Sequence, residues 1–322
     1  MLIAAYAAGL VLAAGPRLAR ARWVARAPGL GIFAWQMWCV AVLASAVLTG
    51  VTATLHWDRT HGVVCRAWRV CLDALLGAHG PAAQLTACGG AALLVLLAGR
   101  LVTAGWRLAS ADRRQRRRLR GLLQQTGRRL PGIGVVVVPA EHPDAYLLPG
   151  GGEQDVVVTS AAVSRLTAEQ LQAVTAHERA HATGRHYRLL RTVQLLHRAF
   201  PRLSCFGTAL RQVQRLVELR ADDVAARSSA PIALAGALVA LAEARAEHAA
   251  AGPGSRGDGP LAAPDGPPLL AAHGGDTTER LHRLLQPRRP LPAGLSRMVA
   301  AGFALAPVLP VVIAAVEHTL PS

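Results

Sequence analysis

Apolar residues gather in four long blocks along the chain, separated by stretches rich in arginine or in mixed polar residues. A helix that crosses a bilayer needs about 20 consecutive, mostly apolar residues. The pattern therefore predicts four transmembrane helices, at residues 2–15, 30–55, 85–105 and 295–316. The first is short and is expected to end at Pro16, while Pro307 and Pro310 should kink the last.

Between the third and fourth blocks, apolar residues recur at the spacings that are typical of the strands and helices of a folded domain. Thr167 and Gln170 form a capping box, which predicts the start of a helix. β-Branched runs predict strands at residues 133–138, 145–148 and 156–159, and helical spacing predicts helices at 113–125, 186–200, 210–227, 232–249 and 277–285. We expect an α+β domain at residues 107–292 with a disordered, Gly- and Pro-rich loop at 251–276, between membrane regions at 1–106 and 293–322.

Charge changes this picture by giving the chain a direction across the membrane. The formal net charge of +16 would ordinarily raise nucleic acid as a partner. The arginines, however, cluster beside the apolar blocks and have no aromatic residues among them, so we expect a lipid bilayer and no direct nucleic acid. Arginine-rich stretches follow the first and third blocks, which places residues 107–292 in the cytoplasm of a multi-pass protein of a bacterial cell membrane and residues 58–80 outside.

The five cysteines do not form a metal-binding pattern. None is paired in a C-x-x-C motif, so a thiolate metal site is not expected. Cys65 and Cys71 lie in one short predicted loop. They either form a disulfide, if that loop faces an oxidising compartment, or remain two unpaired thiols.

The strongest chemical motif is the run His177-Glu178-Arg179-Ala180-His181, which falls inside a predicted helix. A spacing of four places both imidazoles on one helix face, where they can bind the same zinc ion. Glu178 lies a step around the helix, where its carboxylate can take a proton from water without binding the metal. The alternative is a surface helix with two solvated histidines.

A catalytic zinc site needs a third protein ligand and one open position. Glu218 and Asp222 are four residues apart on a predicted downstream helix. We expect Glu218 to bind the zinc and Asp222 to accept the free N–H of a ligand histidine. An ordinary charged helix face, with Glu218 paired to an arginine, is the alternative.

Several motifs together resemble the membrane metallopeptidases of the BlaR/MecR type, which are related to the HtpX and CAAX-prenyl proteases. The resemblance covers residues 130–285 and is carried by Ala145 to Gly150, Val156 to Ser160, Leu166 to Leu171, His177 to His181, Arg215-x-x-Glu218-x-x-Ala221-Asp222 and Arg280 to Leu285. It implies a zincin-like fold, a zinc cofactor and a strand around Tyr146 that holds the substrate. A histidine before the closing helix would stabilise the oxyanion; His273 lies there, and His186 and Tyr187 are rivals.

The expected topology, with three spans before the peptidase and one after, resembles the BlaR/MecR arrangement more than that of HtpX. We expect no extracellular sensor domain after the fourth span, so the resemblance does not imply β-lactam sensing. It implies an endopeptidase that cleaves a cytoplasmic protein, such as a winged-helix transcriptional repressor, in a signalling role. Two alternatives stay open: quality control of membrane proteins, as in HtpX, and a catalytically silent membrane scaffold.

Overall fold

The computed structural model describes residues 2–54, 81–130, 134–147, 156–250, 274–286 and 290–319 of the 322-residue chain. It separates into two compact units. Unit 1 comprises residues 1–105, 192–213 and 291–322, and unit 2 comprises residues 106–191 and 214–290. The predicted loop with Cys65 and Cys71 lies outside the described residues, as do residues 251–273 of the predicted disordered loop.

All regular elements in the described part of unit 1 are helices. They are α1 (Leu2–Gly9), η1 (Leu10–Ala14), α2 (Gly15–Arg20), α3 (Arg22–Arg26), α4 (Pro28–Thr54), the first half of α6 (Pro81–Thr126), the end of α9 (His186–Ala199), the start of α10 (Ser204–Ala225), α13 (Ala293–Leu305) and α14 (Leu309–Thr319). Three stretches are long and apolar enough to cross a membrane: Leu2–Arg20, Pro28–Thr54 and Leu85–Thr126. α13 and α14 meet the same criterion together and are bent by 49°, which confirms the predicted kink in the fourth block.

The first block does not end at Pro16 as predicted. Proline has no N–H and its ring collides with the carbonyl four residues earlier, so it normally stops an α-helix. Here one π-helical turn, η1, precedes the proline, and the Gly15 N–H donates to the carbonyl of Leu10 instead of a carbonyl four residues back. Trp38 of α4 adds a second hydrogen bond to that carbonyl, with 3.0 Å between Nε1 and the oxygen. The helical stretch therefore continues to Arg20.

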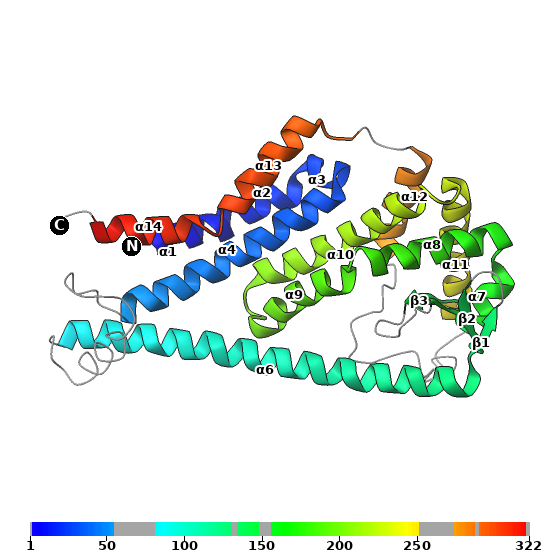
Figure 1. The fold of residues 1–322 in the computed structure, drawn as a ribbon, viewed down its shortest axis with the longest axis horizontal. Helices are drawn as coiled ribbons and strands as arrows, with labels where there is room; N and C mark the ends of the chain where they lie inside the picture. The colour runs from blue at the N-terminus through cyan, green and yellow to red at the C-terminus, as the bar shows by residue number, and fades with distance from the viewer. Residues whose placement is uncertain are drawn as a thin grey trace. The chain divides into compact units, whose positions relative to one another are not determined.

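α6 is one unbroken helix where the sequence predicted a span and a separate helix (Figure 1). Its 46 residues correspond to a length of about 69 Å, more than twice the roughly 30 Å apolar core of a bilayer. The apolar first half passes directly into the arginine-rich second half, because arginine, leucine and glutamine are all good helix formers and no proline intervenes.

Unit 2 contains a four-stranded mixed sheet in the order β1-β2-β4-β3. β2 (Val135–Val138) and β4 (Val156–Thr159) are parallel and central, and β3 (Ala145–Leu147) pairs antiparallel with β4 at one edge. β1 (Arg128–Leu130) was not predicted, since two of its three residues are arginines. It pairs antiparallel with β2 after a turn at Gly134, whose φ of +67° favours glycine.

Both faces of this sheet are covered, and the strand residues alternate between them. Val135, Val156 and Val158 pack on one side with Ala162 of α7, Leu171 of α8 and Leu241 of α11. Val136 and Val157 pack on the other side with Leu119, near the end of α6. Figure 1 shows α7, α8 and α11 grouped beside the strands. The sheet thereby fixes α8 and α11 on the same face, next to the edge strand β3.

The remaining helices carry the chemistry. α8 begins at the predicted capping box. Thr167 Oγ1 accepts a hydrogen bond from the Gln170 N–H, and Gln170 Oε1 accepts one from the Thr167 N–H. α7, a short helix capped by the Thr159 side chain, was not predicted. α10 begins earlier than predicted, and α12 begins within the predicted disordered loop. The bounds are α7 Ser160–Arg165, α8 Ala168–Thr183, α9 His186–Ala199, α10 Ser204–Ala225, α11 Pro231–Ala250 and α12 Gly274–Leu285.

Candidate metal centre

α8 places two histidines side by side inside unit 2. His177 and His181 are one turn apart, and only 5% and 3% of their surfaces are exposed. Their Nε2 atoms lie 3.0 Å from one another. Two ring nitrogens at this separation repel one another when both carry a lone pair, so the arrangement favours a cation between them.

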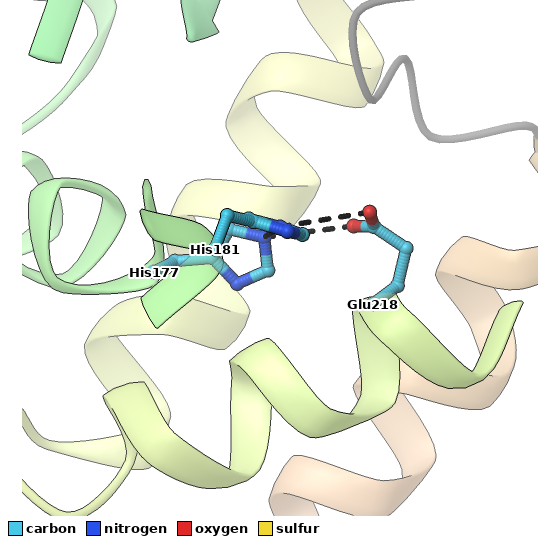
Figure 2. A group of neighbouring side chains, drawn as sticks. All are labelled: His177, His181 and Glu218. Carbon is cyan, nitrogen blue, oxygen red and sulfur yellow. Dashed lines mark hydrogen bonds and ion pairs between the residues drawn. The ribbon is translucent and has the colours of Figure 1, made fainter. Parts of the chain in front are cut away.

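Glu218 of α10 completes a three-residue group (Figure 2). Its Oε2 lies 3.5 Å from His177 Nε2, and its Oε1 lies 3.6 Å from His181 Nε2. Ligands about 2.0–2.1 Å from a tetrahedral zinc lie about 3.3 Å apart, so these spacings fit that ion. Oε1 is also buried without a hydrogen-bond partner among the described residues, which a metal would provide. His177, His181 and Glu218 therefore form a zinc site.

The outer nitrogen of His177 meets a carboxylate. His177 Nδ1 lies 2.9 Å from Asp222 Oδ1, so an N–H there leaves the Nε2 lone pair free for the metal. Arg280 of α12 donates from Nε and Nη2 to both oxygens of Asp222, at 2.7 and 2.8 Å. Burial by itself would raise the pKa of Asp222, but the hydrogen bonds from His177 and Arg280 outweigh it and hold the pKa below its ordinary value.

Arg280 is the functional residue that sequence reasoning missed. It is 3% exposed, and its Nη1 also lies 3.0 Å from Glu218 Oε2, so one guanidinium contacts both carboxylates of α10. The sequence marked it only as part of a closing helix. Two further arginine–carboxylate pairs, Arg215–Glu279 and Arg283–Asp223, join α10 and α12 beside it. α12 is thus held along α10 in the position that brings Arg280 to the ligands.

The outer nitrogen of His181 meets a second imidazole. His186 Nδ1 lies 2.9 Å from His181 Nδ1, and His186 is 1% exposed. The chain reverses between α8 and α9 at Arg185, whose φ is +50°. A side chain at Gly184 would place Cβ 2.3 Å from His186 Nε2, so the glycine makes room for the ring. Burial, together with the nearby Arg220 and His177, lowers the pKa of His186 to about 4, so this partner is neutral at pH 7.

Glu178 lies beside the ligands without joining them. It is 5% exposed, and its Oε2 is buried with no hydrogen-bond partner among the described residues. Burial raises the pKa of this carboxyl to about 7. Glu178, His177, Glu218 and Arg280 all line one cavity. The unpartnered oxygen is therefore available to a water or a substrate group that enters next to the metal ligands.

The three residues considered for the oxyanion have different places. His273 lies outside the described residues. His186 contacts the back of His181, and the Tyr187 hydroxyl donates to Asp112 Oδ2. Neither His186 nor Tyr187 is among the residues that line the cavity at the metal ligands.

Three buried zinc ligands on two helices, beside a small sheet with an edge strand, define a zinc metallopeptidase of the zincin-like class. Comparison with family models gives the same class. The model "Peptidase family M48" matches residues 109–287, more than half of the chain. The chain belongs to peptidase family M48. Neither the curated proteins nor the solved structures contain a match.

Proposed function

We propose that the chain is a membrane-attached endopeptidase in which Glu178 is the general base. The observation that supports this role most directly is its buried Oε2, which has no partner among the described residues and lines the cavity at the ligands. A carboxyl whose pKa lies near the working pH is suited to accept a proton and return it.

The reaction follows from the positions of the side chains. Zinc held by His177, His181 and Glu218 would polarise the scissile carbonyl and acidify the attacking water. Glu178 accepts the proton of that water and then donates it to the leaving amine. Asp222 keeps His177 in the tautomer whose Nε2 faces the metal. A substrate peptide pairs with β3, an edge strand whose outer side is not hydrogen-bonded to another strand of the described sheet.

We further propose that residues 107–292 form the peptidase domain, on the cytoplasmic side of the membrane. Seven arginines lie between residues 107 and 120, in the second half of the helix that contains the third candidate span and after its apolar first half, and the positive-inside rule favours the cytoplasm for such a stretch. The substrate is then a cytoplasmic protein or a cytoplasmic segment of a membrane protein. His273 remains our proposal for the oxyanion.

A transcriptional repressor, cleaved in a signalling role like that of BlaR/MecR, is the substrate we favour. The support is the order of candidate spans along the chain: three begin before the matched region and a bent pair follows it. Quality control of membrane proteins is the second candidate, because the same spans would keep the active site close to other membrane proteins.

The test compares cells with the wild-type chain and cells with Glu178→Gln. The variant should bind zinc normally and lose cleavage by a factor of at least about 10³, since the base is absent while the ligands remain. Accumulation of a single DNA-binding protein supports the repressor, and accumulation of many membrane proteins supports quality control. An unchanged proteome together with full activity of the variant on peptides would refute the role of Glu178.

A further inference from the structure

The second half of α6 packs one of its sides against the rest of unit 2. Leu108 and Leu119 are 2% and 3% exposed, and Leu119 contacts the sheet. Asp112, one turn after Leu108, accepts hydrogen bonds from the side chains of Tyr187 and Arg191 on α9. Leu108, Asp112 and Leu119 are separated by four and seven residues, so they lie on one side of the helix. This side of α6 is therefore buried in the fold.

The opposite side of the same half carries exposed arginines. Successive residues of an α-helix are about 100° apart around the axis, which turns five arginines away from Leu108, Asp112 and Leu119. They are Arg107, Arg113, Arg114, Arg117 and Arg118, and we call them the outward face of α6. None of the five has an ion-pair partner among the residues that the structure describes. Arg116 differs, because it lies near the buried side with its guanidinium 4.9 Å from the centre of the Tyr187 ring.

No acid of the helix compensates the charge of the outward face. Asp112 is the only acidic residue of the sequence between positions 107 and 126, and it is already bound to Tyr187 and Arg191. The five guanidinium groups of the outward face occupy about 17 Å of helix length. Charges of the same sign at such spacings repel one another unless counter-ions or a partner lie between them. The outward face therefore favours a partner that brings several negative charges together.

Trp106 indicates which anionic partner lies within reach. It follows the apolar first half of α6, is 68% exposed, and lies on the same side of the helix as Arg113 and Arg117. Tryptophan is enriched where the apolar core of a bilayer meets the headgroups. Arg113 and Arg114 lie about 10–12 Å beyond Trp106 along the axis, and an arginine side chain can extend back toward the headgroup layer, which is roughly 5–8 Å deep. Arg117 and Arg118, about 16–18 Å beyond Trp106, are at the limit of that reach.

We propose that the outward face of α6 binds the headgroups of anionic phospholipids at the membrane surface. Arg107, Arg113 and Arg114 donate hydrogen bonds to the lipid phosphates, while Arg117 and Arg118 add a weaker attraction over a longer distance. A zwitterionic lipid offers the same phosphate but cancels its charge, so it binds more weakly. The positive-inside rule counts arginines whichever way they point, whereas this surface requires the five to point outward. It does not depend on the proposed peptidase function.

The first experiment measures lipid binding to the full chain in detergent by native mass spectrometry. Phosphatidylglycerol and phosphatidylcholine with the same acyl chains are titrated separately. Wild type should bind phosphatidylglycerol about 10-fold or more tightly than phosphatidylcholine, and added salt should reduce the difference. Arg113→Gln combined with Arg114→Gln should weaken phosphatidylglycerol by about 10-fold or more, at roughly 5-fold for each arginine, and should change phosphatidylcholine far less. Glutamine is a good helix former, so α6 itself should persist.

The second experiment separates a lipid headgroup from a soluble polyanion. A lipid headgroup is held at the level of Trp106, so Arg117→Gln combined with Arg118→Gln should weaken phosphatidylglycerol by no more than about 3-fold. Short DNA duplexes, polyglutamate or glycerol phosphate, added at the concentration of the lipid and at physiological ionic strength, should not displace it. Displacement by any of these, or equal losses for the two pairs of arginines, would mean that a soluble anion is the partner and would overturn the proposal.

A matched variant removes the same charge elsewhere in unit 2. Arg128 of β1 and Arg165 of α7 are exposed and do not belong to the outward face, so Arg128→Gln combined with Arg165→Gln should keep the preference for phosphatidylglycerol. An equal loss in this control would mean that net charge alone attracts the lipid and would refute the proposal.

Zinc content and thermal melting show that each variant is folded. If the variant at positions 113 and 114 does not fold, Arg107→Gln, next to Trp106, should by itself weaken phosphatidylglycerol by about 5-fold. A wild type without preference for phosphatidylglycerol, or an unchanged affinity in the folded variants of Arg107, Arg113 and Arg114, would also overturn the proposal. Neither result would bear on peptide cleavage, so the proposed function is tested separately.

Discussion

The two ligand histidines of α8 are presented in the same way and supported differently. His177 and His181 both direct Nε2 toward Glu218, and both have an Nδ1 within 2.9 Å of a buried partner. For His177 that partner is the Asp222 carboxylate, itself bound by Arg280. For His181 it is the imidazole of His186. One helix therefore carries a ligand with a charged support and a ligand with a neutral support.

The difference shows which property each support provides. A carboxylate orients the ligand ring and also increases its basicity, which strengthens metal binding. A neutral imidazole that accepts the N–H orients the ring and selects its tautomer but adds no charge. Burying a further carboxylate would require another cation, as Arg280 is required for Asp222 and Glu218. We infer that the His177 side contributes most to zinc affinity and the His181 side mainly to geometry.

Among substitutions around the ligands, Asp222→Ala should cause the largest loss of zinc affinity and of stability. It removes the support of His177 and leaves the Arg280 guanidinium buried without that bidentate partner. Zinc affinity should fall by about 10- to 100-fold, and the free energy of unfolding by roughly 3–5 kcal/mol. Competition with a zinc chelator and thermal melting measure the two quantities. Asp223→Ala, which removes the adjacent carboxylate, is the control and should keep zinc; equal losses in both variants would contradict the assignment.

His186→Ala should have a smaller effect on zinc. The neutral acceptor of His181 is lost but no charge is left unpaired, so we expect zinc affinity to fall by about 10-fold, at the lower end of the range for such partners. His186→Asn places a carbonyl oxygen where Nδ1 lies and should recover most of the loss. The same chelator competition measures both variants. If His186→Ala weakened zinc more than Asp222→Ala, the order of the two supports would be wrong.

Arg283→Met tests whether any ion pair between α10 and α12 can affect the metal. Arg283 and Asp223 form a bidentate pair with both contacts at 2.7 Å, but the Asp223 side chain is 33% exposed. Solvent screens such a pair, so the free energy of unfolding should fall by no more than about 1 kcal/mol. Zinc affinity should not change. Loss of zinc in this variant would mean that docking of α12, and not the Arg280 contact, controls the site.

The ligand set was predictable from the sequence because it depends on local spacing. His177 and His181 are one helical turn apart, and Glu218 and Asp222 repeat that spacing on a second helix. Any helix that forms over these residues places each pair on one face. The capping box at Thr167 fixed the start of the first helix for the same reason, since its two hydrogen bonds join residues only three apart.

Two supports of the site, Arg280 and His186, were not predictable in their observed positions because they depend on tertiary packing. Arg280 reaches Asp222 across 58 residues of sequence, and nothing in its own neighbourhood distinguishes it from other arginines of the chain. His186 Nδ1 lies next to His181 Nδ1 only because the backbone changes direction at Arg185, between α8 and α9. The error at Pro16 has a similar origin, since the π-helical turn before it is matched to a hydrogen bond from Trp38 on another helix.

The smallest change in zinc affinity and stability is expected for Arg165→Gln, at the surface of unit 2. Arg165 of α7 and Glu247 of α11 are joined at 2.6 Å, yet their side chains are 52% and 58% exposed. Water and salt compete fully for both charges, so Arg165→Gln should leave zinc affinity and the melting temperature unchanged within error. This variant removes a guanidinium as Arg283→Met does, but from a pair that joins α7 to α11 and not α10 to α12. A measurable loss of zinc in Arg165→Gln would show that metal binding depends on overall charge and not on the contacts of Asp222 and His186.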